Sequence, residues 1–182
     1  SLSITPLRPV QRVQIKSGNA AHVAAIGTKL FCAALLPVTA AAYRTDERLV
    51  NGINVWTKPL KFELSLAVHF LTLALMFNLL NERASGSRIV RWALYAAAAS
   101  GVFEIVYIAL QSARGRASHF NLDTSIESAL YMAMGVGSLL LTAAPIILGI
   151  QIWRNGRTDI GAGLRRGAIL GLVFGGIATI IT

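Results

Sequence analysis

The residues of this sequence best suited to chemistry are ionisable side chains that lie inside long apolar runs. Glu104 lies within the apolar run 89–113, and His69 lies within the run 60–80. An ionisable group at membrane depth is costly and needs a partner, water or a ligand. Glu104 and His69 are therefore the first candidates for a proton-accepting or ligand-binding site.

Polar residues recur along both runs at helical spacing. In the run 89–113 the steps of four, three, four and three residues place one set on a single helix face: Ser100, Glu104, Tyr107, Gln111 and Arg114. The run 60–80 carries a weaker stripe of the same kind: Ser65, His69, Thr72 and Met76. Such stripes face neighbouring helices or a water-filled cavity rather than lipid.

The depths of the two ionisable residues are similar. His69 lies eight residues beyond Lys61, which is about 12 Å along a helix. Glu104 lies ten residues before Arg114, or about 15 Å. Two antiparallel helices can bring the side chains together. They form either a buried hydrogen bond that joins the helices or a proton-accepting or ligand-binding pair, and the residues leave both alternatives open.

Two polar motifs flank these runs on the same side. Residues 51–62 read NGINVWTKPLKF, in which Trp56 and Lys58 suit an interfacial anchor. Asn51-Gly52, followed by Asn54, predicts a turn with side-chain hydrogen bonds.

The second motif, residues 111–121, reads QSARGRASHFN. Gly115 is expected to end a helix, and TSIE at 124–127 predicts a capping box for the next one. A simple loop needs polarity but not this set of donors, so we predict a functional or tightly structural role. Together the stripes and motifs give the candidate ligand-binding residues: Asn54, Trp56, Lys58, His69, Glu104, Gln111, Arg114, Ser118, His119 and Asn121.

The two motifs, NxWxKPxKF and RGxxSHFN, resemble those of a family of uncharacterised bacterial polytopic membrane proteins. The resemblance covers about residues 51–137 and includes Glu104 and Gln111. It implies further helices with additional histidines beyond this sequence, and it implies no particular activity or cofactor.

The elements that position these residues are predicted to be membrane-spanning helices. Of the 182 residues 54% are hydrophobic and 14% charged, with a mean hydropathy of +0.60, whereas soluble domains carry about 25% charged residues. Five runs reach the length of about 20 residues that a spanning helix needs. We predict an all-α polytopic bundle in one domain, 1–182, with spans near 20–43, 60–80, 89–113, 126–153 and 164–182. The start without Met and the apolar end suggest part of a longer chain.

The basic residues indicate topology rather than nucleic-acid binding. The net charge is +9, but the Lys and Arg residues lie mostly between the apolar runs. The side that holds the N-terminal segment has about ten of them and the other side about six. The positive-inside rule places the N-terminus in the cytoplasm, with both motifs facing outward, in a multi-pass protein of a bacterial inner membrane.

The last run carries a glycine at every fourth position: Gly163, Gly167, Gly171 and Gly175. This glycine strip predicts close packing against another helix, in this chain or in a partner. Cys32 lies alone in the first run and suits packing. His69 and His119 are too few for a zinc site of three or four ligands, so no metal site is predicted.

Three functions fit these features. The first is binding or transport of a small anionic or amphiphilic ligand, or of protons, through an outward cavity rimmed by the motifs and floored by His69 and Glu104. The second is a non-catalytic subunit or assembly factor of a membrane complex. The third is a membrane enzyme with His119 or Glu104 as acid–base catalyst.

Overall fold

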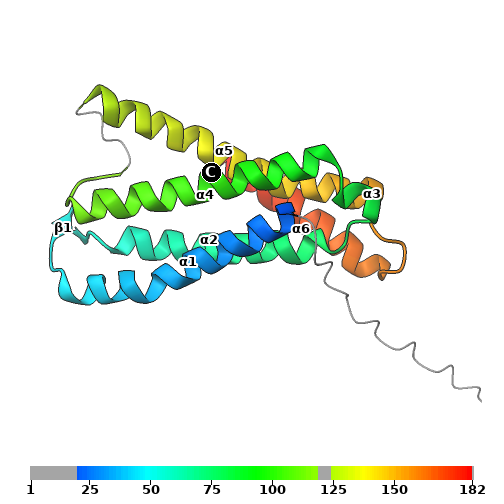
Figure 1. The fold of residues 1–182 in the computed structure, drawn as a ribbon, viewed down its shortest axis with the longest axis horizontal. Helices are drawn as coiled ribbons and strands as arrows, with labels where there is room; N and C mark the ends of the chain where they lie inside the picture. The colour runs from blue at the N-terminus through cyan, green and yellow to red at the C-terminus, as the bar shows by residue number, and fades with distance from the viewer. Residues whose placement is uncertain (1–19, 119–123, 182) are drawn as a thin grey trace, which may run out of the picture.

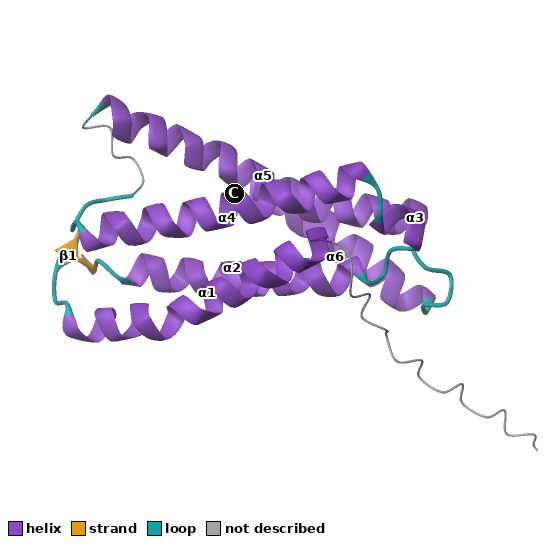
Figure 2. Cartoon of the chain, in the orientation of Figure 1, coloured by secondary structure: helices purple, strands orange, loops and turns teal. Residues whose placement is uncertain are grey.

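The computed structural model describes residues 20–118 and 124–181, with side chains as far as Thr179. In chain order its elements are α1 (Ala20–Thr45), β1 (Leu49–Val50), β2 (Ile53–Asn54), α2 (Thr57–Phe77), α3 (Glu82–Ser85), α4 (Arg88–Ala113), α5 (Ser125–Asn155) and α6 (Ala162–Ile181). Figure 1 shows the long helices running along one common direction, and Figure 2 shows that the two short strands lie at one end. The predicted all-α class is confirmed.

Four helices, α1, α2, α4 and α5, are long and apolar enough to cross a membrane. Outward-facing apolar side chains agree with this: on α2, residues Leu64, Val68, Leu71 and Leu75 are all exposed. α6 is not among the four. The fifth predicted span therefore stays a prediction.

The helices pack as neighbours in chain order: α1 on α2, α4 on α5 and α5 on α6, with α1 also on α4. The core between them holds large side chains from several helices, such as Phe70, Phe77, Leu94, Ile105 and Ile152. Figure 1 shows that the N-terminal part of α5 diverges from α4 toward the end of the bundle that carries the strands. The bundle is therefore tighter at one end than at the other.

The tight end is tied together by its loops. Leu80 pairs with Gly156 in a β-bridge, and Asn81 caps the short helix α3. As a result α2 ends at Phe77 and not at residue 80, because Leu79 and Leu80 are buried in this turn rather than in the helix. The apolar run continues past the helix end, so α2 ends three residues before the approximate end of the predicted span.

The opposite end, which we call the hairpin end, carries the strands β1 and β2. They pair antiparallel through a two-residue turn in which Asn51 has φ 53° and Gly52 has φ 78°. Positive φ at both central residues is the geometry that Asn-Gly favours in tight hairpins. The predicted turn at Asn51-Gly52 is confirmed.

Candidate functional site

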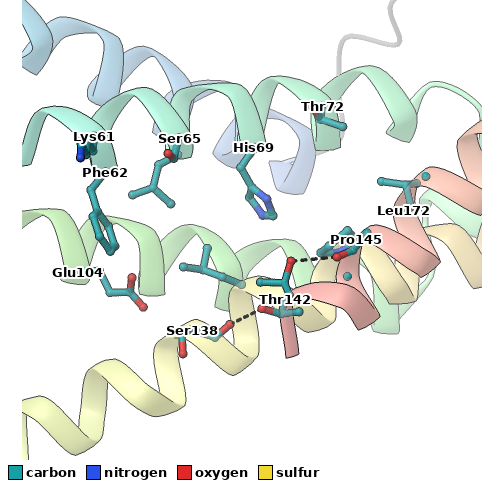
Figure 3. A pocket seen from close by; sticks show the side chains of 16 residues that line it. Lys61, Phe62, Ser65, His69, Thr72, Glu104, Ser138, Thr142, Pro145 and Leu172 are labelled. Atoms are coloured by element: carbon teal, nitrogen blue, oxygen red, sulfur yellow. Dashed lines mark hydrogen bonds between the residues drawn. The ribbon is translucent and has the colours of Figure 1, made fainter. Parts of the chain in front are cut away.

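The central candidate site is a cavity of about 510 Å³ between α2, α4, α5 and α6, which we call the inner cavity. Figure 3 shows side chains projecting into it from these helices. Its lining is formed by Lys61, Phe62, Ser65, Leu66, His69, Thr72, Glu104, Ser138, Leu141, Thr142, Pro145, Gly171, Leu172, Gly175, Gly176 and Thr179. His69 and Glu104, predicted from different helices, thus line the same cavity.

Most hydroxyl groups of the inner cavity are satisfied within their own helices. Thr72 donates to the carbonyl of Val68 and Thr142 to that of Ser138, at 2.9 and 2.8 Å. Ser138 likewise donates to Gly135. Hydroxyls on helices commonly bond back to the preceding turn in this way. These groups therefore do not require a ligand.

His69 and Glu104 differ from the hydroxyls. Nε2 of His69 and Oε1 of Glu104 are buried and have no hydrogen-bond partner among the described residues. No hydrogen bond joins the two side chains, so the predicted locking bond between α2 and α4 is not present. A buried polar atom without a partner costs about 1–3 kcal/mol. Two such atoms in one cavity indicate a place where a water, proton or ligand group is accommodated.

Two glycines allow the helices around these residues to approach closely. A Cβ at Gly101 of α4 would lie 2.8 Å from Cε2 of Phe70, the residue after His69. A Cβ at Gly137 of α5 would lie 2.9 Å from Oε1 of Glu104. Sequence reasoning missed both glycines, since their role depends on what faces them across the helix interface.

A second cavity of about 460 Å³ lies at the hairpin end, and we call it the outer cavity. It is lined by Val50, Asn51, Ile53, Asn54, Val55, Thr57, Lys58, Lys61, Phe62, Ser112, Arg116, Ala117 and Ser118. Residues of both predicted motifs therefore meet in one place. Lys61 and Phe62 line the inner and the outer cavity, so the two cavities adjoin at these residues.

Part of the first motif has a structural role. Asn54 donates to the carbonyl of Asp46 at 2.6 Å and accepts from the backbone N–H of Trp56 at 2.9 Å. The indole N–H of Trp56 donates to the Asp46 carboxylate at 2.8 Å, so Trp56 lines neither cavity. Asn54 and Trp56 hold the hairpin against the start of α2.

Asp46 is the centre of this network. Arg48 donates to both of its carboxylate oxygens, at 2.9 and 2.6 Å. The Arg48 guanidinium, with the Trp56 indole, holds the pKa of the Asp46 carboxyl well below its usual range. Arg48 also donates to the carbonyl of Ala113 at 3.1 Å, which ties the hairpin to the end of α4.

The second motif is divided between structure and cavity lining. Gly115 has φ 66°, and the N–H of Arg116 bonds the carbonyl of Gln111, which is the predicted glycine helix end. Gln111 is buried and donates to the Tyr107 hydroxyl at 3.1 Å, while Arg114 donates to Gln111. Gln111 and Arg114 line neither cavity, contrary to the rim that the sequence predicted for Arg114.

The described residues of the second motif that line the outer cavity are Ser112, Arg116, Ala117 and buried Ser118. Arg116 also forms an ion pair with buried Glu127 at 3.0 Å. Thr124 caps α5 by accepting from the N–H of Glu127, which confirms the predicted capping box on its backbone side. His119 and Asn121, both predicted site residues, lie outside the described residues.

Sequence reasoning missed Glu63, whose side chain is fully buried in α2. Its Oε1 accepts a hydrogen bond of 2.7 Å from Thr39 of α1, and its Oε2 has no partner among the described residues. Glu63 lines neither cavity. The available signal was a carboxylate inside the apolar run 60–80, off the stripe that contains His69.

The glycine strip of α6 makes no close contact with another helix of the described residues. Cβ atoms at Gly163, Gly167, Gly171 and Gly175 would meet nothing within 4 Å. The close contact of α6 is made by Gly176, where a Cβ would lie 2.5 Å from Cγ1 of Ile146 on α5. Packing within the chain thus uses the glycine next to the strip, and the strip itself is open.

Comparison of the chain with protein-family models, curated proteins and solved structures gave no match. Within residues 20–118 and 124–181 no three His, Cys, Asp or Glu side chains are grouped so that they could hold a metal ion. The two cavities and their side chains are therefore the features that indicate function.

Proposed function

We propose that this protein binds, and transports, a small ligand or protons through the inner cavity, with His69 and Glu104 as the groups that contact it. The observation that carries the proposal is the pair of buried atoms, Nε2 of His69 and Oε1 of Glu104, that lack partners in one cavity. Ionisable groups at membrane depth mark ligand and proton pathways more often than they serve packing.

The proposal includes the membrane and the orientation in which the site lies. The chain is a multi-pass protein of a bacterial inner membrane, with five spans, a cytoplasmic N-terminus and the hairpin end facing outward. The excess of Lys and Arg on the side opposite the hairpin supports that orientation. The resemblance of its two motifs to uncharacterised bacterial membrane proteins adds a grouping and no activity.

Flux measurements on reconstituted protein test the proposal. Full-length chain in liposomes that contain a pH-sensitive dye is compared with Glu104→Gln and His69→Gln, which remove the ionisable groups but keep side-chain size. We expect both variants to reduce proton or ligand-coupled flux at least tenfold. The matched control is Glu63→Gln, a buried carboxyl of α2 that lines neither cavity, and it should leave the flux unchanged.

Binding is measured in parallel, because a binding protein need not conduct protons. Native mass spectrometry of the purified chain should show a retained small molecule that Glu104→Gln and His69→Gln lose and Glu63→Gln keeps. If neither flux nor retained mass responds to the two cavity variants, the proposal is wrong.

A second function, a subunit of a membrane complex, is favoured by the open glycine strip. A Cβ added at Gly163 or Gly167 would meet no atom of the described residues within 4 Å, and neither glycine is in the lining of the inner cavity. Small residues allow another helix to approach closely. Co-purification of a stoichiometric partner that is lost in Gly167→Leu would support this function over the first. Retention of the same partner by Gly167→Leu would count against it.

A further inference from the structure

The two adjoining cavities differ in character. Among the described residues, the lining of the outer cavity has three cationic side chains, Lys58, Lys61 and Arg116, and no carboxylate. The inner cavity continues from Lys61 and Phe62 toward the middle of the bundle, past apolar Leu66, Leu141 and Leu172. The two cavities adjoin at Lys61 and Phe62. The outer one is cationic, and the inner one combines this apolar part with polar side chains that include His69 and Glu104.

At the cationic end, Lys61 and part of the Arg116 guanidinium offer charge for a ligand. Lys61 is exposed and makes no ion pair with a described residue. Arg116 uses Nη1 for Glu127, and its guanidinium carries further N–H donors. Three like charges along one cavity repel each other, and an anion placed among them removes that repulsion. The outer cavity thus suits an anionic group.

The length of the inner cavity suits a hydrocarbon chain. From Lys61 to Thr72 it follows α2 over eleven residues, or about 16 Å at 1.5 Å per residue. That is about half of the 30 Å hydrocarbon core of a bilayer, the depth of one leaflet. A ligand whose head lies at Lys61 would therefore extend to mid-membrane, where a lipid chain of that leaflet also ends.

The inner cavity is also open sideways to the membrane. Several of its lining residues are exposed, among them Ser65 and Thr72 on α2, Ser138 on α5 and Gly175 on α6. They lie within the helices, not at their ends, so in a bilayer the opening faces acyl chains. An amphiphile can enter through this opening without its tail leaving the apolar phase.

We infer that the ligand is a single-chain anionic amphiphile, with its head between Lys58, Lys61 and Arg116 and its tail along Leu66, Leu141 and Leu172 of the inner cavity, beside His69 and Glu104; this rests on the proposed function. A free anion would occupy the outer cavity and leave the inner one unused. A zwitterionic lipid would meet the three cations with a positive group of its own. The head is thus of the phosphate or carboxylate class, carried by a molecule that partitions into the membrane.

The test is equilibrium binding of three probes to the full chain in nanodiscs: palmitoyl lysophosphatidylglycerol, palmitoyl lysophosphatidylcholine and glycerol phosphate. The anionic lysolipid should bind at least tenfold more tightly than the zwitterionic one. Lys61→Gln should weaken the anionic lysolipid about tenfold, the loss of about 1.4 kcal/mol, and leave the zwitterionic one unchanged.

The tail is tested with a leucine introduced into the inner cavity. A Cβ at Gly175 would meet nothing within 4 Å, so Gly175→Leu adds a side chain at the lining of the inner cavity and should weaken both lysolipids severalfold. Gly167→Leu, on the same strip but outside the cavity, is the matched control and should bind both as the native chain does. Size-exclusion profiles and helical circular dichroism verify that each variant is folded.

Two results would overturn the inference. Glycerol phosphate that competes as strongly as the anionic lysolipid, with no effect of Gly175→Leu, would show a free anion as the ligand. Equal binding of the two lysolipids, unchanged by Lys61→Gln, would show that the cationic side chains do not recognise the charge of the headgroup. If flux or the retained mass still depends on Glu104 in either case, the proposed function stands and only the identity of the ligand is wrong. If that dependence is also absent, both the proposed function and the inferred ligand are wrong.

Discussion

Gly101→Ala should destabilise the protein, because α4 approaches Phe70 of α2 at this glycine. The added Cβ would lie 2.8 Å from Cε2 and 3.2 Å from Cζ of the Phe70 ring. Phe70 is fully buried, so the ring cannot move aside without displacing its neighbours. The contact holds α2 and α4 at the spacing that places His69 and Glu104 on the same cavity.

The magnitude follows from two opposing effects. Overpacking of a well-packed interior costs about 1–3 kcal/mol, while alanine is favoured over glycine within a helix by about 1 kcal/mol. The net loss for Gly101→Ala is therefore up to about 2 kcal/mol in the free energy of unfolding. At Gly135 of α5, where a Cβ would meet nothing within 4 Å, the same change should be neutral or stabilise by up to about 1 kcal/mol.

The assay is equilibrium unfolding in mixed micelles of increasing denaturing-detergent content, followed by circular dichroism. Gly101→Ala should unfold at a lower detergent fraction than the native chain, and Gly135→Ala should not. If Gly101→Ala is as stable as Gly135→Ala, then α2 and α4 do not approach as closely as described, and the positions of His69 and Glu104 lose their support.

Three further predictions concern the hairpin end. The lowered pKa of Asp46 means that its network contributes stability above the ordinary Asp pKa and loses it only as pH falls through the lowered value. The indole N–H resonance of Trp56 should therefore stay unshifted down to strongly acidic pH, but Asp46→Asn should shift it at every pH. Gly52→Ala, at φ 78°, should cost about 1–2 kcal/mol and should be seen as faster amide exchange in the hairpin; unchanged exchange would contradict the positive φ. Thr124→Ala removes the cap of α5 and should lower unfolding stability by about 1 kcal/mol, whereas Thr158→Ala, an exposed threonine outside the helices, should not.

The parts of the fold that local chemistry dictates could be predicted from the sequence. The length of the apolar runs gave the helices, and the turn at Asn51-Gly52 and the helix end at Gly115 follow from which residues tolerate positive φ. The cap at Thr124 follows from a hydroxyl three residues before a carboxylate. Each of these depends on residues close together in the chain.

The parts that depend on which helices meet could not be predicted in the same way. Helical spacing put Arg114 on the face of Glu104, but the turn at Gly115 directs Arg116 rather than Arg114 to the cavity. The regular glycine strip predicted packing, yet α6 packs through Gly176, one residue beyond it. Which helix packs against a given helix face depends on the positions of the other helices, and the sequence of one apolar run does not contain that information.

For His69 and Glu104, the sequence predicted that the two side chains share one location, but not whether they contact each other. Their similar depth could be estimated from the helical rise, and both line the inner cavity. Their separation could not, since it depends on Phe70 and Gly101 fixing the distance between α2 and α4. Of the two alternatives left open, the direct hydrogen bond is not formed, and each residue has a buried atom without a partner among the described residues.

The most direct test of the central claim is an electron-microscopy map of the full chain in lipid nanodiscs, at a resolution that shows side chains and bound ligands. We predict non-protein density in the inner cavity, in contact with Nε2 of His69 and with Glu104, and separated from the protein chain itself. An inner cavity closed by repacked helices, with His69 hydrogen-bonded directly to Glu104, would contradict the claim that this cavity is the functional site.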